Sequence, residues 1–366
     1  MKRSPMTPTT RGPTPLIGSP ASWAHRCGRL ALVLLLFGCA VSCTPSSNYS
    51  AKAWSSYDIL LVVQANSKLV LEGVDTKTGH ADALTTVARF DNSLVPEASI
   101  FLSGDTGYIV VNTGSDPFSA EVFDIDRPTK SLRDLGPLAA GRLPVMTGSD
   151  QLTAFGSSGN GYLQTTISLP GLGNPKTSPF AVVPYGSDGS CTLGTGSAGQ
   201  GPAVIAEGTT VGPFPLTPSD VASSVACGGG RQVVTVSGRI DPSTSEKQEP
   251  TTVAQLAVVD AQGTLQRWPT AGKPRLVCLL DQDRAVVDIE DQPGHRAAQV
   301  VDVRTGAAAP PVPLGDLQSV GALSCDHDTI VAVGDNRVVV VNPTATGQDP
   351  TSIELTGPAR TSVIRW

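Results

Sequence analysis

Charged and aromatic residues are both scarce in this chain. Lys, Arg, Asp and Glu together make up 16% of the 366 residues, and Phe, Trp and Tyr make up 5%. A mainly helical protein would draw more heavily on Ala, Glu, Lys and Leu, so the composition argues against that class. Glycine (38) and proline (30) are plentiful, hydrophobic residues reach 40%, and valine is the dominant strand former. We therefore predict an all-β protein with many turns and a sizeable core.

Charge is unevenly placed along the chain. Residues 1–43 carry five Lys or Arg and no acid, and because the whole chain is −6, residues 44–366 carry −11. An acidic body without a basic stripe interleaved with aromatic residues argues against nucleic acid as a partner.

Motifs for catalysis or for cofactor binding are also missing. The sequence has no Gly-x-Ser-x-Gly, no His-Glu-x-x-His and no EF-hand loop. It has no Cys-x-x-Cys and no paired histidines, which disfavours a metal site. GTGSAG at 194–199 matches a dinucleotide fingerprint, but a strand-like stretch follows it where that chemistry needs a helix. We therefore assign no catalytic residue and expect no cofactor.

Other polar candidates are more simply explained as turn residues. These are the run Asp326-His327-Asp328, the carboxylate pair Asp124 and Asp126, and the histidines His80 and His295. Aspartate is favoured in turns because its side chain hydrogen-bonds nearby backbone.

The first 43 residues resemble a secretion signal. A basic, polar stretch precedes the apolar run Leu30–Phe37, which is too short for a membrane span of about 20 residues. The end of this segment is similar to a bacterial lipoprotein signal, because a cysteine follows small residues at Leu36-Phe37-Gly38-Cys39 and again at Ala40-Val41-Ser42-Cys43.

This resemblance implies a lipid anchor, such as palmitate, on Cys39 or alternatively on Cys43. An ordinary cleaved signal or an uncleaved short anchor stays open, as does a start at Met6. Residues 44–53 are predicted to be a polar tether, which leaves 54–366 as one domain. The expected location is the extracytoplasmic face of the cell membrane, or the secreted fraction if no lipid is added.

A repeat runs through residues 54–366. An apolar run closing on Asp or Asn and followed by a turn occurs at 73–79, 122–126, 258–263, 300–306 and 340–342. The one long gap leaves room for two degraded copies, placed at 162–171 and near 209–218. Units of roughly 45 residues with four strands each are typical of a β-propeller blade. The predicted blades span 54–93, 94–141, 142–186, 187–221, 222–273, 274–318 and 319–358.

The pattern Val-Val-Asp-x-x-Thr-Gly of residues 300–306 resembles the third strand of WD-repeat-like and YVTN-type β-propellers. The resemblance covers most of the domain and implies architecture alone. It supports a seven-bladed ring, with six or eight blades as alternatives. Residues 57–64 match a second strand and 360–366 match a first strand, so the C-terminal strand is predicted to close the ring as the innermost strand of the first blade.

Four cysteines beyond the signal fall in similar register. Cys191, Cys227, Cys278 and Cys325 each lie at or near the end of a predicted first strand. In a propeller the first strands line the central channel, where neighbours come within the Cα separation of about 4.4–6.8 Å that a disulfide needs. An oxidising compartment would allow such bonds. We predict Cys191–Cys227 and Cys278–Cys325, with four buried free thiols or a metal site as alternatives.

The function is predicted less closely than the fold. Residues 240–253 and Asp288–Arg296 are predicted inserts between second and third strands, which would project from one face and form a binding surface. The first hypothesis is a monomeric, non-catalytic, membrane-anchored module that binds an envelope protein or ligand. The alternative is a propeller enzyme (quinone-dependent dehydrogenase, lyase or glycosidase) with its site at the channel mouth; a structural role in an envelope complex is a third possibility.

Overall fold

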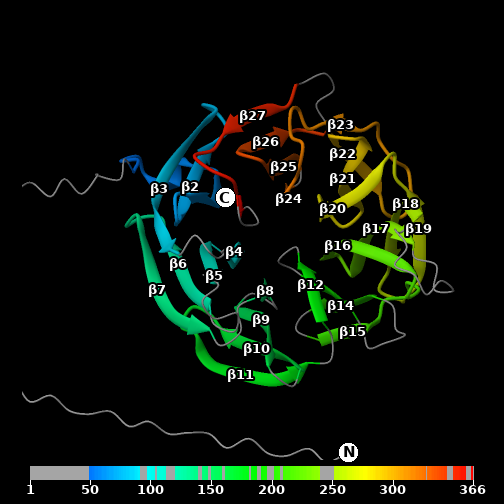
Figure 1. Ribbon diagram of the computed structural model, residues 1–366, viewed down its shortest axis with the longest axis horizontal. Helices are drawn as coiled ribbons and strands as arrows, with labels where there is room; N and C mark the ends of the chain where they lie inside the picture. Colours follow the sequence, from blue (N-terminus) through cyan, green and yellow to red (C-terminus); the bar gives the residue numbers. More distant parts are fainter. Residues whose placement is uncertain are drawn as a thin grey trace, which may run out of the picture. The chain divides into compact units, whose positions relative to one another are not determined.

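The computed structural model describes residues 49–90, 97–103, 105–112, 120–138, 142–146, 150–158, 161–180, 183–187, 191–195, 202–206, 209–239, 251–326, 328–343, 349–359 and 364–365. In these residues, the strands form seven four-stranded antiparallel sheets arranged as a ring (Figure 1). The predictions of an all-β fold and of a β-propeller are confirmed. Across the same ranges, no helix has the length and apolar character that a membrane span requires.

In each sheet the strands follow the chain from the inner to the outer strand, except that the last strand of the chain, β28, is the inner strand of the first sheet (Figure 1). The first three sheets are β28 (Ile364–Arg365), β1 (Ile59–Ala65), β2 (Lys68–Asp75) and β3 (His80–Arg89); β4 (Glu97–Ser103), β5 (Thr106–Asn112), β6 (Ala120–Asp126) and β7 (Ser131–Leu138); and β8 (Arg142–Met146), β9 (Gln151–Ser158), β10 (Gly161–Ser168) and β11 (Gly173–Phe180). The fourth and fifth are β12 (Val183–Ser187), β13 (Cys191–Thr195), β14 (Pro202–Ala206) and β15 (Thr209–Pro213); and β16 (Asp220–Gly228), β17 (Arg231–Arg239), β18 (Thr251–Val259) and β19 (Leu265–Pro269). The last two are β20 (Lys273–Leu279), β21 (Arg284–Gln292), β22 (His295–Asp302) and β23 (Val312–Pro313); and β24 (Ala322–Asp326), β25 (Thr329–Gly334), β26 (Arg337–Val341) and β27 (Thr351–Glu354).

The ring is closed by strands from opposite ends of the domain. β28 pairs antiparallel with β1 through Ile59 with Arg365 and Leu60 with Ile364. An isolated bridge between Val63 and Ala359 extends this contact. The predicted closure by the C-terminal strand is confirmed.

The core lies between neighbouring sheets, and the alternation of side chains along each strand explains how. Leu60 of β1 packs with Ile109 of the second sheet, whereas the next residue, Leu61, packs with Val333 of the seventh sheet. Successive side chains of a strand point to opposite faces, and here both faces are covered. Strands buried on both faces are apolar almost throughout, which is why these strands are rich in valine.

The Asp that closes the third strand of the first and sixth sheets has a local structural role. Asp302 Oδ1 accepts hydrogen bonds from the backbone N–H groups of Arg304 and Thr305, both at 2.9 Å. Gly306 then donates its N–H to the carbonyl of Asp302 at 2.8 Å and adopts a φ of 73°. Asp75 makes the same contacts with the N–H groups of residues 77 and 78. The repeated Asp-x-x-Thr-Gly is thus the sequence of a tight turn that ends the third strand.

The fourth sheet departs from the predicted boundaries. β12 (Val183–Ser187) is its first strand, although most of it had been assigned to the third blade. The third strand is β14, so the copy predicted near 209–218 is wrong, because that range begins with the fourth strand β15. Strands of five residues that do not end in the Asp turn have too weak a sequence pattern for their positions to be predicted.

One connection between sheets demands glycine on steric grounds. A Cβ on Gly334, at the end of β25, would lie 1.7 Å from the carbonyl oxygen of Ser319, in the connection from the sixth sheet. The side chain of Asp335 holds this connection in place, because it accepts hydrogen bonds from the Gln318 N–H at 3.0 Å and the Ser319 hydroxyl at 2.9 Å.

We expect Gly334→Ala to destabilise the domain by about 3 kcal/mol or more, since the added methyl meets backbone that cannot rotate away. Urea unfolding monitored by circular dichroism would measure it. Gly173→Ala is the matched control, because a Cβ there meets no atom within 4 Å. Equal unfolding midpoints for the two variants would contradict this account of the connection.

Candidate functional site

One face of the ring carries the turns predicted to form a binding surface. Because the strands of each sheet are antiparallel, the turn between its second and third strands and the connection to the next sheet lie at the same end. We call this end the crossover face; its described parts include turns 66–67, 293–294 and 335–336 and connections 270–272, 314–321 and 355–359. The predicted insert 240–253 begins on it between β17 and β18, and its residues 240–250 lie outside the described part.

The second predicted insert, Asp288–Arg296, is not a loop. β21 continues through Gln292, β22 begins at His295, and only Pro293 and Gly294 form the turn. Glu290 pairs with Arg296 across this hairpin. The prediction was wrong because a charged sequence suggested a solvated excursion, whereas part of its charge is buried and paired across strands.

A buried ion pair anchors this hairpin. Asp288 and Arg296 are 0% and 3% exposed, and the guanidinium donates to the carboxylate. Arg296 also lies 3.7 Å from Glu290, which in turn accepts a hydrogen bond from Arg275 at 3.1 Å. Burial, with the nearby positive charge of Arg275, lowers the pKa of Arg296 to about 10, so the group stays charged at neutral pH. Removing either partner would leave an isolated buried charge, which is strongly destabilising.

Arg296 is also part of the wall of a cavity on the crossover face. The cavity has a volume of about 330 Å³ and lies between the β21–β22 turn and the connection to the seventh sheet. Exposed Asp291, Asp316 and His295 line its mouth, and Pro311 and Pro313 provide an apolar side. His295, expected in a turn, begins β22 at this mouth.

A second charged cluster lies on the same face in the fifth sheet. The Asp220 side chain is fully buried and accepts hydrogen bonds from Arg267 at 2.8 Å and Arg239 at 3.1 Å. The Thr217 N–H and hydroxyl add bonds of 2.9 and 3.0 Å. Burial alone would raise the pKa of Asp220, but these hydrogen bonds outweigh it and lower the pKa to about 2. Arg239 is half exposed and ends β17, so the cluster fixes the end of this strand on the crossover face.

The low pKa of Asp220 makes its contribution to stability depend on pH. The folded-state pKa of about 2 lies below the ordinary 3.8, so the ionised carboxylate stabilises the fold above pH 3.8. This contribution is lost as the pH falls from 3.8 toward 2. We expect Asp220→Asn to lower the free energy of unfolding by about 2 kcal/mol at pH 7. The difference in this free energy between the wild type and the variant should narrow below pH 4. Urea unfolding from pH 7 to pH 2.5 would measure the gap; a constant gap would contradict the assignment.

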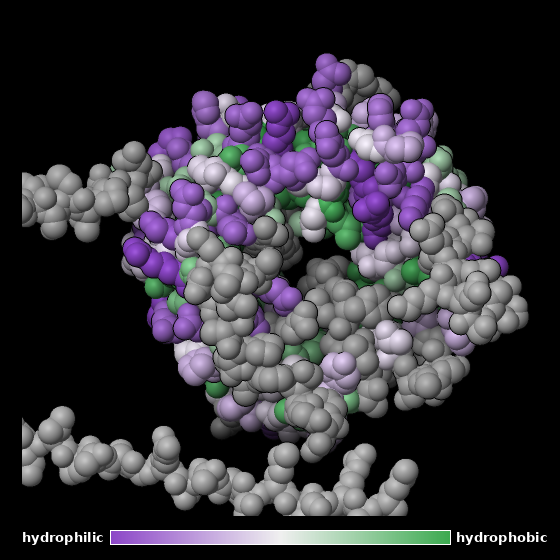
Figure 2. Space-filling model, in the orientation of Figure 1, coloured by the Kyte–Doolittle hydropathy of each residue, from purple (hydrophilic) through white to green (hydrophobic). Residues whose placement is uncertain are grey.

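The centre of the ring is hollow and is surrounded by first strands (Figures 1 and 2). Among the described pairings, β16, β20 and β24 are each bonded on one side only, to their second strands. Backbone edges therefore face the opening. The exposed charged residues of these strands, such as Lys273 and Asp326, lie toward the strand ends. Within the described ranges no three His, Cys, Asp or Glu residues are grouped as a metal site.

The remaining sequence candidates lie apart from one another. His80 begins β3 and is exposed, and Asp326 and Asp328 flank the β24–β25 turn, with His327 outside the described residues. Gly194 lies in β13, and the next described element is the strand β14 from Pro202, whereas a dinucleotide site needs a helix after its glycines. Cys39 and Cys43 fall outside the described residues.

Both predicted disulfides are present. Cys191–Cys227 has a Cα separation of 5.9 Å and Cys278–Cys325 one of 5.7 Å. Cys227, Cys278 and Cys325 lie in first strands, as predicted. The placement of Cys191 was wrong, because it begins the second strand, β13. It still reaches Cys227 because the start of β13 lies at the same end of the sheet as the end of β12.

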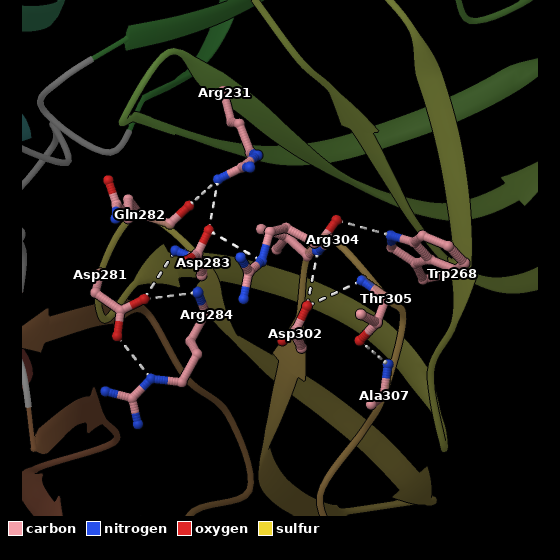
Figure 3. Close-up of polar contacts among 11 residues, drawn as sticks. Arg231, Trp268, Asp281, Gln282, Asp283, Arg284, Asp302, Arg304, Thr305 and Ala307 are labelled. Carbon is pink, nitrogen blue, oxygen red and sulfur yellow. Dashed lines mark hydrogen bonds and ion pairs between the residues drawn. The ribbon is translucent and has the colours of Figure 1, made fainter.

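The opposite face holds a polar seam between the fifth and sixth sheets that the sequence did not reveal. Asp283 accepts from Arg231 at 2.9 Å and lies 3.3 Å from Arg304 (Figure 3). Trp268 of β19 donates its Nε1–H to the carbonyl of Val303 at 3.1 Å. A Cβ on Gly306 would lie 2.2 Å from the Trp268 ring, so the absence of a side chain at this glycine leaves room for the indole. The seam joins two sheets and is a structural contact.

Comparison with known proteins supports the fold. No protein-family model matches the chain, and no curated protein matches it. Among solved structures, a putative 6-phosphogluconolactonase from Bacteroides fragilis is 13% identical with a TM-score of 0.53, covering 86% of this chain and 99% of that one. A putative 6-phosphogluconolactonase from Bacteroides uniformis is 14% identical with a TM-score of 0.55, covering 84% and 98%. At this identity the likeness concerns the β-propeller fold alone.

Proposed function

We propose that this chain is a lipid-anchored, extracytoplasmic β-propeller that binds an envelope protein through the crossover face of its fifth and sixth sheets. The observation that carries the proposal is the concentration of fixed charge there. Asp220 is bonded to two arginines at the crossover end of the fifth sheet, and the Asp288–Arg296 pair fixes the hairpin whose Arg296 lines the cavity. Preorganised charged groups favour specific recognition, because binding then requires little further ordering.

Two features of different kind support the proposed location. The two disulfides are of a sort that persists in oxidising compartments. The sequence of residues 30–43 resembles a lipoprotein signal, with Cys39, or alternatively Cys43, as the lipidated residue. The acidic body is consistent with a protein partner and not with nucleic acid.

Metabolic labelling with a palmitate analogue tests the anchor. We expect label on the wild type and on Cys43→Ala, and loss of label and of membrane association for Cys39→Ala. The reverse pattern would assign the lipid to Cys43. Label on neither residue in the wild type would refute the anchor.

Cross-linking in intact cells followed by affinity capture tests the binding surface. Asp291→Lys reverses one exposed charge at the cavity mouth and should remove the captured partner. Asp328→Lys makes the same change at an exposed turn on the opposite face and serves as the matched control. Equal capture by the two variants, with both folded by circular dichroism, would refute the proposed surface.

A further inference from the structure

A buried carboxyl group lies in the seam that closes the ring. Glu72 of β2 is 0% exposed and lies between Val70 and Val74, which pack against apolar residues of the seventh sheet such as Ile353. Because side chains alternate along a strand, Glu72 points to the same face as these two valines. A group that is ionised in water at neutral pH is therefore enclosed where the first sheet meets the seventh.

Glu72 is bonded to the segment that closes the ring. Its described hydrogen bonds come from Thr356, in the connection from β27 to β28: the Thr356 N–H donates to Oε1 at 3.1 Å and the hydroxyl to Oε2 at 2.8 Å. The next residue, Gly357, lies so close to β1 that a Cβ there would be 2.1 Å from the carbonyl oxygen of Gln64. The connection is thus packed directly on the first sheet, and Glu72 holds its beginning.

Within the described part of the chain, no basic group forms an ion pair with Glu72. β1 and the connection 355–359 contain no titratable side chain. The titratable residues of the other elements around this seam are Tyr49 before the first sheet, His80, Asp82 and Arg89 in β3, Asp326 in β24, Arg337 in β26, Glu354 in β27 and Arg365 in β28. Asp82 is paired with Lys52 at 2.9 Å, and Glu354, which is 83% exposed, lies 3.5 Å from Arg337.

The surroundings of Glu72 favour its neutral form. Burial is the largest influence and raises the pKa of Glu72 above its ordinary 4.5; the hydrogen bonds from Thr356 offset part of this effect, and the negative charge of Asp82 adds to it. The folded chain therefore binds this proton more tightly than the unfolded chain. The resulting stabilisation is complete below pH 4.5 and is lost as the pH rises through the folded-state pKa, which is the opposite direction from Asp220.

The charge of Glu72 acts on the closing seam in particular. When the first and seventh sheets separate, water can hydrate an ionised carboxylate at this position, whereas a neutral carboxyl group gains much less from water. Ionisation therefore favours the open seam over the closed one. The inner strand at this seam, β28, pairs with β1 through only two residues, so little other pairing opposes the opening.

We propose that Glu72 is a proton-dependent latch on the ring. Protonation of its carboxyl group strengthens the contact between the first and seventh sheets, and ionisation loosens it. A mildly acidic medium therefore holds the ring closed more firmly than a neutral one. The latch concerns the first and seventh sheets and does not depend on the partner proposed for the fifth and sixth.

Hydrogen exchange of the purified full chain in detergent at pH 5 and pH 7.5, read by mass spectrometry, tests the latch. Each rate is divided by that of an unstructured peptide at the same pH, because intrinsic exchange itself depends on pH. We expect the protection of β1 to fall between pH 5 and pH 7.5, by up to about tenfold for each unit by which the pKa of Glu72 in the closed seam exceeds that in the open seam. The protection of β17, in the fifth sheet, should change much less.

Glu72→Gln carries no charge at either pH, so the protection of β1 should not depend on pH in this variant. The comparison also removes the contribution of histidines, which titrate in the same range. A protection of β1 that is equal at both pH values in the wild type, or a pH dependence that persists in Glu72→Gln, would overturn the proposal.

A second variant keeps the test decisive if Glu72→Gln fails to fold. Thr356→Val removes the hydroxyl that bonds the ionised carboxylate, so it should lower the urea unfolding midpoint more at pH 7.5 than at pH 5. Thr351→Val makes the same change at an exposed position of β27 and should have the same effect at both pH values. Equal effects of Thr356→Val at the two pH values would also overturn the proposal.

Discussion

Removal of residues 360–366 is expected to abolish cooperative folding of the domain. The deletion removes β28 and with it the strand partners of Ile59 and Leu60 on the inner edge of β1, where Leu60 and Val62 are fully buried in the intact ring. The ring would then be open at the Ile59 end of β1, although Ala359 would still bridge to Val63. Since native domains are stable by only about 5–15 kcal/mol, the loss of an inner strand is enough to unfold this one. Urea unfolding followed by far-ultraviolet circular dichroism, with size-exclusion chromatography, would show the loss.

Addition of a peptide in trans separates strand loss from general damage. A synthetic peptide of residues 356–366 supplies β28 and can pair with the free edge of β1, as strands add to exposed sheet edges in other proteins. We expect it to restore a cooperative transition, whereas a scrambled peptide should not. A truncated chain that melts like the wild type would show that the ring closes without its C-terminal strand.

The positions of the third strands along the chain were the part of this fold that the sequence could predict. The Val-Val-Asp-x-x-Thr-Gly turn recurs because a buried third strand must end in a tight turn, and that local requirement is written in adjacent residues. Aligning these turns placed the third strands of five sheets, and from there 360–366 and the cysteine pairs followed. The fourth sheet was misplaced where its short strands lack that turn.

The charged groups of the candidate sites could not be predicted in the same way. Asp288 and Arg296 are eight residues apart and meet only because β21 and β22 pair in a particular register. Asp124 and Arg127 belong to a cavity whose other wall comes from Ser55, about 70 residues away. The chain read in order presents each of these residues as an ordinary polar turn residue, and only the folded ring brings them together.

The two disulfides should be the next largest contributors to stability. They enclose sequence separations of 36 and 47 residues. By the chain-entropy model, each cross-link of that length stabilises the folded state by about 4 kcal/mol, because it restricts the unfolded chain. We expect the free energy of unfolding to fall by about that amount in each of two double variants, Cys191→Ala/Cys227→Ala and Cys278→Ala/Cys325→Ala. The variant lacking all four cysteines should be close to unfolding at 37 °C.

Urea unfolding with and without reductant would measure these losses. Reductant should lower the unfolding midpoint of the wild type strongly and leave that of the four-alanine variant unchanged. The four-alanine variant therefore controls for side effects of the reagent. A wild-type midpoint that does not respond to complete reduction, verified by thiol counting, would contradict the predicted contribution.

The positions of the disulfides also predict where the ring opens first. Cys191–Cys227 ties the fourth sheet to the fifth, and Cys278–Cys325 ties the sixth to the seventh. In the described part of the first three sheets no such covalent tie occurs, and the short β28 closes the seam between the first and seventh. Local opening requires least free energy where contacts are fewest, so the first sheet should exchange its amide hydrogens fastest among the buried strands. Reduction should then raise exchange in β16 and β20 far more than in β1, and uniform acceleration across all sheets would contradict this order.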